Sequence, residues 1–182
     1  MTTLYDNYHQ KGRQQLFKEL GLKNIMSVPK LEKVVINVGL GEALSNKKVI
    51  DQVIQQLSII TGQKAVPTVA RKDISTFKVR KGDVVGIKVT LRARKMFDFI
   101  EKLSKIVLPR IRDFRGIPNT GFDKMGNYTL GLSEQIVFPE IDYSQVDKIR
   151  GMELTFVTNS EQIGTKKLME YLGYPFEGRR RK

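Results

Sequence analysis

Two segments of the chain alternate hydrophobic and polar residues with the period of two that is typical of a half-buried β-strand. The clearer one, DVVGIKVTLRA (residues 83–93), places apolar residues at positions 85, 87, 89 and 91 on one face. The other, EKVVINVG (residues 32–39), places Asn37 opposite an apolar face. Further short strands are predicted at residues 64–72, 128–134 and 151–159. Pro67 weakens the first of these three and places it near a sheet edge.

Apolar residues that recur at spacings of three and four predict helices. The first helix is expected to end near Gly21, and another to occupy residues 94–111. Between them, Ser45 or Asn46 is expected to cap a helix that ends at Thr61-Gly62. A last helix is expected to begin at Asn159 or Ser160 and to end at LGYP.

The order of these elements indicates the fold class. Parallel strands are usually joined by a helical crossover, and the chain has more predicted strands than its predicted helices could connect in this way. We therefore predict an α+β domain with a mainly antiparallel sheet and helices packed on one face. Residues 70–83 form a long basic hairpin in this prediction, and residues 109–127 form a long loop that apolar residues dock onto the protein. A single RNA-binding domain is expected over residues 1–182, with a disordered basic tail at 178–182.

Amino-acid composition limits the classes of function that the protein can have. The chain has 32 basic and 19 acidic residues in 182, a net charge of +13, and such a field attracts polyanions, nucleic acid before anionic membrane. It has no cysteine and one histidine, so disulfides and thiolate chemistry are excluded, and we expect no cofactor and no metal. The N-terminus does not resemble a signal peptide, and no apolar run is long enough for a membrane span. We therefore expect a cytoplasmic protein with no membrane partner.

Gly39 and Gly41 stand between a predicted strand and a predicted helix, as in folds that bind nucleotides. The dinucleotide fingerprint requires a third glycine at position 44, which is Leu44, and no Gly-Lys-Ser/Thr sequence completes a phosphate loop. We therefore predict that the protein is not an enzyme and has no small-molecule substrate. The two glycines are interpreted as a tight turn that leaves the backbone open to close approach.

Charge is distributed unevenly along the chain. Residues 71–95 contain nine basic and two acidic residues, a net charge of +7, whereas residues 134–161 contain two basic and six acidic residues, a net charge of −4. A basic cluster is often no more than a solvated surface. Here the polar face of the predicted sheet adds hydroxyl and amide groups to the cations, which together suit phosphate and ribose contacts in structured RNA. This face gathers Asn37, Thr68, Lys88, Thr90, Arg92, Thr129 and Ser133, with Gln63 and Lys64 at a strand entry. The candidate RNA contacts among them are Asn37, Gln63, Lys64, Thr68, Lys88, Thr90 and Arg92.

The predicted hairpin ARKDISTFKVRKGD (residues 70–83) is basic and carries one aromatic residue, Phe77. Such a projecting loop is suited to contacting a second RNA surface. Phe77 is either part of that contact or a buried anchor of the loop, and the sequence leaves both alternatives open. The candidate contact residues in the hairpin are Arg71, Lys72, Phe77, Lys78, Arg80 and Lys81.

Three stretches closely resemble the bacterial-type family of large-subunit ribosomal protein number five, the ribosomal protein L5 family that binds 5S rRNA. They are KVVINVGLGEA, TGQKAVPTVARKDISTFKVRKGDVVGIKVTLR and PRIRDFRGIPNTGFDKMGNYTLGLSEQIVFPEID. The resemblance spans nearly the whole chain. It implies a structural constituent of the central protuberance that helps to attach 5S rRNA to the large subunit, with large-subunit rRNA as a further partner.

The resemblance also implies particular contacts. In this family a sheet face near the first and third strands contacts 5S rRNA, and the matching positions are Asn37, Gln63, Lys64, Thr90 and Arg92. The hairpin is implied to reach P-site tRNA. A further region is implied to contact a small-subunit head protein as an inter-subunit bridge. Our candidate is the acidic stretch, whose charge suits a basic protein partner, through Glu140, Asp142, Tyr143 and Asp147.

Overall fold

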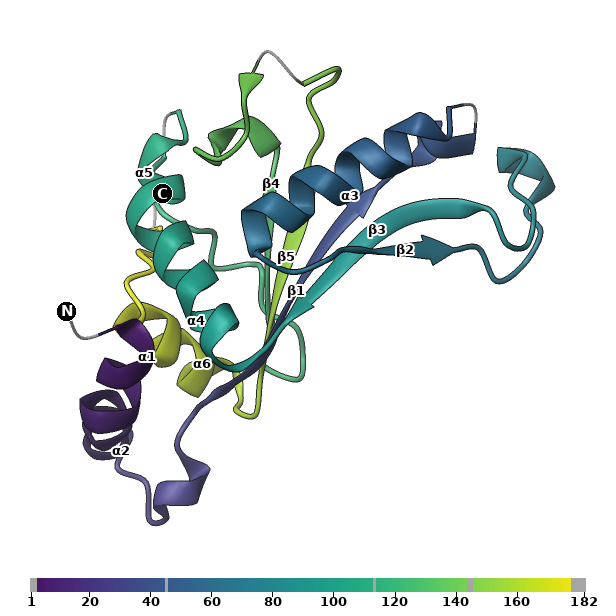
Figure 1. Ribbon diagram of the computed structural model, residues 1–182. Coiled ribbons are helices and arrows are strands. Elements are labelled where there is room, and N and C mark those ends of the chain that lie inside the picture. The colour runs from purple at the N-terminus through teal and green to yellow at the C-terminus, as the bar shows by residue number, and fades with distance from the viewer. Residues whose placement is uncertain (1–2, 45, 113, 144–145, 178–182) are drawn as a thin grey trace, which may run out of the picture. The chain divides into compact units, whose positions relative to one another are not determined.

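The computed structural model describes residues 3–44, 46–112, 114–143 and 146–177. These residues form a five-stranded antiparallel sheet with the strand order β2-β3-β1-β5-β4 (Figure 1). The strands are β1 (Leu31–Gly39), β2 (Val66–Val69), β3 (Val84–Leu91), β4 (Tyr128–Leu132) and β5 (Met152–Thr158). The predicted α+β class is confirmed, and β2 is the short edge strand that Pro67 indicated. The predicted basic tail at 178–182 lies outside the described residues.

The chain divides into two compact units, and the boundary falls within β1, β4 and β5. The first unit contains Met1–Val34, Arg92–Leu130 and Thr155–Lys182, and the second contains Val35–Leu91 and Gly131–Leu154. Each unit has its own buried apolar side chains. Ile100, Leu168 and Tyr174 belong to the core of the first unit, whereas Leu57, Ile87 and Leu91 belong to that of the second.

The helices of the first unit are α1 (Leu4–Asn7), α2 (Arg13–Glu19), α4 (Ala93–Lys102), α5 (Leu108–Arg110) and α6 (Gln162–Tyr171). A π-helical turn joins α1 to α2, and another joins α4 to α5. The second turn precedes Pro109, whose missing N–H and bulky ring disturb regular helical hydrogen bonding. The predicted cap of α6 is displaced, because the N-cap residue is Glu161 and no side chain bonds to the helix start there.

The helix of the second unit, α3 (Lys48–Thr61), lies along β2 and β3 (Figure 1). Its apolar side chains at Val49, Val53 and Leu57 are buried, as their spacing predicted. Gly62 ends the helix in the left-handed conformation, with a φ of 64°. At the other end a short helical turn, Gly41–Leu44, separates β1 from α3. The predicted cap at Asn46 is displaced by one residue, because the N-cap is Lys47, whose side chain makes no capping bond. The Asn46 side chain still accepts a hydrogen bond from the Lys48 N–H at 3.1 Å. Ser45, the alternative cap, lies outside the described residues.

The long loop after α5 is docked onto the first unit, as predicted. Ile117 is fully buried, and its backbone pairs with the chain around Phe176, donating to the Pro175 carbonyl at 2.7 Å and accepting from the Glu177 N–H at 2.9 Å. Phe122 packs against the ring of Tyr128, with centroids 4.8 Å apart. These backbone bonds explain how an irregular segment of this length remains fixed.

Gly126, at the end of this loop, has a φ of 81°, which only glycine adopts without strain. A Cβ atom at this position would overlap the carbonyl oxygen of Ser160 and the backbone of Glu161. Gly131 in β4 provides the contrast, because it has no positive φ and a Cβ atom there would meet open space.

We predict that Gly126→Ala lowers the free energy of unfolding by about 2–4 kcal/mol, since it combines backbone strain with overpacking. Gly131→Ala is the matched control and is expected to change stability by less than about 1 kcal/mol. Urea unfolding of both variants measures the difference. Equal stabilities of the two variants would show that the contact with Ser160 does not constrain the loop.

Candidate nucleic-acid interface

The strands β1 and β3 present one buried face and one exposed face. Ile36, Val38 and Ile87 are buried, whereas Asn37 and Lys88 are exposed on the other face. Thr90 is partly exposed. The alternation of the sequence therefore places an amide, an ammonium and a hydroxyl group on one surface, because successive side chains of a strand point to opposite sides.

The predicted alternation is wrong at Val85. Thr68 pairs with Gly86 and Val69 pairs with Val84, so Val85 has no partner on β2 and forms a bulge. As a result Val85 is exposed although it belongs to the predicted apolar face. Gly86 stays on the polar face with Lys88, and it is buried because the side chain of its partner Thr68 lies over it. The extra residue interrupts the alternation at Val85 and leaves the other predicted faces unchanged.

Gly86 allows close contact between neighbouring strands. A Cβ atom on this residue would lie 2.9 Å from the carbonyl oxygen of Val38 and 3.0 Å from the hydroxyl oxygen of Thr68. The absence of a side chain at Gly86 thus permits Thr68 to lie over β3, on the same face as Lys88.

Gln63 connects the end of α3 to the end of β3. Its side-chain amide donates to the Thr90 carbonyl oxygen at 3.0 Å, and its backbone N–H donates to the Thr61 hydroxyl at 3.3 Å. Gln63 therefore positions the strand that carries Thr90. Lys64 follows it and is exposed.

Arg92 belongs to the first compact unit, unlike the other candidate RNA contacts. It is exposed, stands at the N-cap of α4, and has an extended backbone with a φ of −140°. Of the candidate RNA contacts, the second unit brings together Asn37, Gln63, Lys64, Thr68, Lys88 and Thr90.

The tip of the hairpin between β2 and β3 is held by its two acidic residues. Asp73 accepts a hydrogen bond from the Lys81 backbone N–H at 2.7 Å, and Asp83 accepts one from the Arg80 backbone N–H at 2.7 Å. Ile74 and Val79 exchange backbone bonds of 2.8 and 3.1 Å. The carboxylates are thus bonded to backbone groups rather than to the basic side chains around them.

All basic side chains of the hairpin are exposed. None of them forms an ion pair with another residue in the described part of the chain, and they are Arg71, Lys72, Lys78, Arg80 and Lys81. Phe77 is 70% exposed, so the alternative of a buried anchor is wrong. The hairpin therefore presents a concentration of unpaired positive charge beside an accessible aromatic ring.

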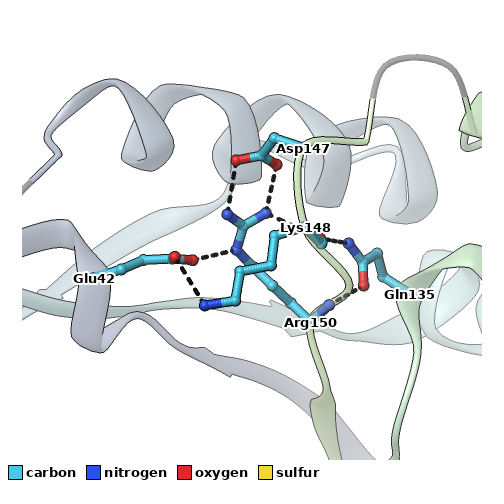
Figure 2. A network of polar contacts seen from close by, with 5 residues as sticks. All are labelled: Glu42, Gln135, Asp147, Lys148 and Arg150. Atoms are coloured by element: carbon cyan, nitrogen blue, oxygen red, sulfur yellow. Dashed lines mark hydrogen bonds and ion pairs between the residues drawn. The ribbon is translucent and has the colours of Figure 1, made fainter.

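The acidic stretch is held in place by Arg150, which sequence reasoning did not single out (Figure 2). The Arg150 side chain is only 7% exposed, and its guanidinium donates to Glu42 at 2.7 Å and to both carboxylate oxygens of Asp147 at 2.8 and 2.9 Å. Gln135 accepts from the Arg150 backbone N–H and donates to the Lys148 carbonyl at 2.7 Å. One buried guanidinium thus joins the turn after β1 to the segment before β5.

These contacts shift the acid–base equilibria of the network. Hydrogen bonds from Arg150 lower the pKa of Asp147 to about 2 and lower the pKa of Glu42 below its ordinary value. The same contacts, first with Asp147 and then with Glu42, raise the pKa of Arg150. The network is therefore charged on both sides at neutral pH.

Of the four residues predicted for a protein contact, Asp147 is engaged within the protein by Arg150. Glu140 and Asp142 are exposed, and Tyr143 is 71% exposed. Residues 144–145 lie outside the described part of the chain.

Gly39 ends β1 and Gly41 begins the short helical turn that follows it, where a turn was predicted. Neither glycine has a positive φ, and a Cβ atom at either position would meet open space, so the backbone of the turn does not require glycine. Among the described residues, no group of three or more His, Asp or Glu side chains is arranged to hold a metal ion. No helix in the described ranges is long and apolar enough to cross a membrane.

Comparison with known proteins identifies the family. Residues 24–80 match the family model described as ribosomal protein L5, and residues 84–176 match the model that describes the C-terminus of the same ribosomal protein family.

Full-length relatives agree with the family models. The chain is 49% identical to the large ribosomal subunit protein uL5 of Desulforamulus reducens over 177 residues, which cover 97% of this chain and 98% of the relative. It is 50% identical to uL5 of Mesoplasma florum over 95% of this chain and 97% of the relative, and 52% identical to uL5 of an Anaeromyxobacter species over the same shares.

Fold and surface together define a basic α+β protein with an exposed polar sheet face and a cationic hairpin. The chain belongs to the ribosomal protein L5 family, whose members compared above are proteins of the large ribosomal subunit. It is therefore a structural, non-enzymatic component of the translation machinery, as predicted.

We predict that Arg150→Met lowers the free energy of unfolding by about 2–4 kcal/mol, because it removes the buried cation that Glu42 and Asp147 both bond to. Lys148→Met removes the other cation bonded to Glu42, and its ion pair is exposed. This control is expected to cost less than about 1 kcal/mol. Urea unfolding at neutral pH distinguishes the two, and similar costs would contradict a central role for Arg150.

The lowered pKa of Asp147 also predicts a pH dependence. A carboxyl group whose pKa is lowered by folding stabilises the protein above its unfolded pKa, near 3.8, and loses that contribution as the pH falls towards 2. Because the Asp147 side chain is 38% exposed, the contribution is screened and is expected to be about 1 kcal/mol.

Asp147→Asn should therefore be less stable than the unsubstituted protein at pH 6, and the difference should shrink between pH 4 and pH 2.5. Denaturant unfolding at several pH values measures this. A difference that stays constant with pH would mean that the ion pair with Arg150 does not stabilise the fold.

Proposed function

We propose that the protein binds 5S rRNA through the exposed face of β1, β2 and β3 and helps to attach it in the central protuberance of the large subunit. In this proposal residues 1–182 act as one RNA-binding domain. The observation that carries the proposal is the grouping of Asn37, Thr68, Lys88 and Thr90 on one exposed face of a sheet whose other face is buried.

The chemistry of this face favours structured RNA. Hydroxyl and amide groups bond to ribose hydroxyls and phosphate oxygens, and lysine adds charge attraction. The predicted contact residues on the face include no aromatic side chain on which unpaired bases would stack. A helical groove of folded RNA therefore fits the face better than a single strand.

We further propose that the hairpin contacts P-site tRNA. Five exposed cations without ion pairs in the described part of the chain support this assignment, since each is available to a phosphate. The backbone bonds to Asp73 and Asp83 favour a hairpin tip that keeps its shape without RNA.

The acidic stretch is proposed to contact a protein of the small-subunit head and so to form an inter-subunit bridge. Its carboxylates repel RNA and attract a basic protein. Glu140, Asp142 and Tyr143 are exposed and are the direct candidates. Asp147 contributes through its bond to Arg150, which fixes the segment.

A salt titration tests the RNA proposal. The affinity for 5S rRNA should fall as salt rises, with a slope of about −0.9 in log affinity against log salt for each phosphate contacted on a duplex. Filter binding from low to moderate salt measures the slope, with an unrelated RNA hairpin of equal length as the control. Salt-independent binding, or equal affinity for the two RNAs, would contradict specific recognition.

Substitutions on the two surfaces locate the site. Asn37→Ala is expected to weaken 5S rRNA binding by about fivefold to tenfold through the loss of a hydrogen bond, and Thr90→Ala to act similarly. Lys81→Ala in the hairpin serves as the matched control and should weaken it less. A larger effect of Lys81→Ala would show that 5S rRNA binds at the hairpin instead.

A further inference from the structure

A groove lies between α3 and the acidic stretch of the second unit. Its volume is about 220 Å³, which is smaller than the roughly 300–1,000 Å³ of pockets for drug-sized ligands. A space of this size suits one side chain. The groove is lined by Gln52, Gln55, Gln56, Ile59, Glu140, Ile141 and Asp142.

The lining has an unusual composition for a protein with a net charge of +13. It contains two carboxylates, three side-chain amides and two isoleucines, and it contains no cation. Glu140 and Asp142 stand on one wall, and the glutamines stand on α3. The lining therefore carries a net negative charge, which favours a cation over a phosphate group.

The walls of the groove are held by the surrounding structure. Gln56 and Ile141 also line a small buried space whose other walls include Arg150 and Leu57. Ile141 donates its N–H to the Phe138 carbonyl at 3.2 Å. The segment that carries the carboxylates thus rests on the same core that the buried Arg150 network supports.

We propose that this groove binds the side chain of an arginine presented by a basic protein partner. A guanidinium is flat, so its faces pack against the two isoleucines while its edge donates to carboxylate and amide oxygens. An ammonium offers no comparable flat surface. The inference rests on the proposed contact with a small-subunit protein and adds to it the kind of residue that is recognised and the place where it binds.

The isolated full-length protein allows a direct test. N-acetyl-arginine methylamide is titrated into ¹⁵N-labelled protein, with the lysine and norleucine analogues as comparison probes. The expected result is millimolar binding of the arginine probe, with chemical-shift changes at residues 52–59 and 140–142, and at least fivefold weaker binding of the other two. Changes confined to other regions, or equal binding of norleucine, would overturn the proposal.

A filled groove provides the second arm of the test. Gln55→Arg places a guanidinium in the groove from an exposed helical position, and it is expected to weaken binding of the arginine probe at least fivefold. Gln14→Arg adds the same side chain at an exposed position of α2 outside the groove and should leave binding unchanged. Equal effects of the two variants would mean that added charge alone is responsible, which would overturn the proposed site.

A third measurement separates this inference from the bridge on which it rests. Large subunits carrying Glu140→Gln with Asp142→Asn are mixed with small subunits, and association is followed by light scattering. Weakened association supports the bridge. Unchanged association, together with arginine binding to the isolated protein, would overturn the bridge and the assignment of its partner while the groove's preference for arginine stands.

Discussion

The two-sided character of β1 and β3 is the constraint on which the rest of the second unit depends. Ile36, Val38 and Ile87 are buried, and α3 packs against β3. Their burial fixes the direction of every other side chain on these strands. Asn37 and Lys88 face outward as a consequence, because a strand cannot reverse one residue without reversing its neighbours. The bulge at Val85 supports this rule, since the alternation is interrupted only where an extra residue enters the ladder.

Acidic residues are used differently from basic ones in this chain. Asp73 and Asp83 bond to backbone N–H groups in the hairpin, and Asp147 and Glu42 bond to the buried Arg150. Each of these carboxylates holds a turn or a loop. The hairpin cations are left unpaired by this arrangement, so the positive charge that the sequence concentrates there remains available to a polyanion.

The sequence predicted the fold well where alternation or helical spacing is strong. The strands β1 and β3, the helix α3 and the docking of Ile117 were all predictable from local patterns. The bulge was not, because it depends on pairing between β2 and β3 that no single strand encodes.

The exposed residues of the candidate site were predictable from the sequence, whereas the residues that hold them in position were not. The exposed face and the exposed hairpin cations follow from local patterns in the sequence. Arg150 was missed because its partners, Glu42 and Asp147, lie 108 and 3 positions away, and only folding brings them to one guanidinium. Gln63 was predicted as a contact residue, and its bond to Thr90 adds a positioning role that spacing does not reveal.

The exposed polar face of the sheet and the acidic groove coexist in the second unit because the sheet and α3 lie between them. The polar face of β3 lies on one side of the sheet, and α3, which lines the groove, packs against the other side. A helix and a sheet stacked face to face place their outer surfaces more than roughly 10 Å apart, which exceeds the Debye length of about 8 Å at physiological salt. Each surface therefore acts on its own partner with little cancellation. A protein with a net positive charge can in this way present a positive surface to RNA and a negative surface to a basic protein.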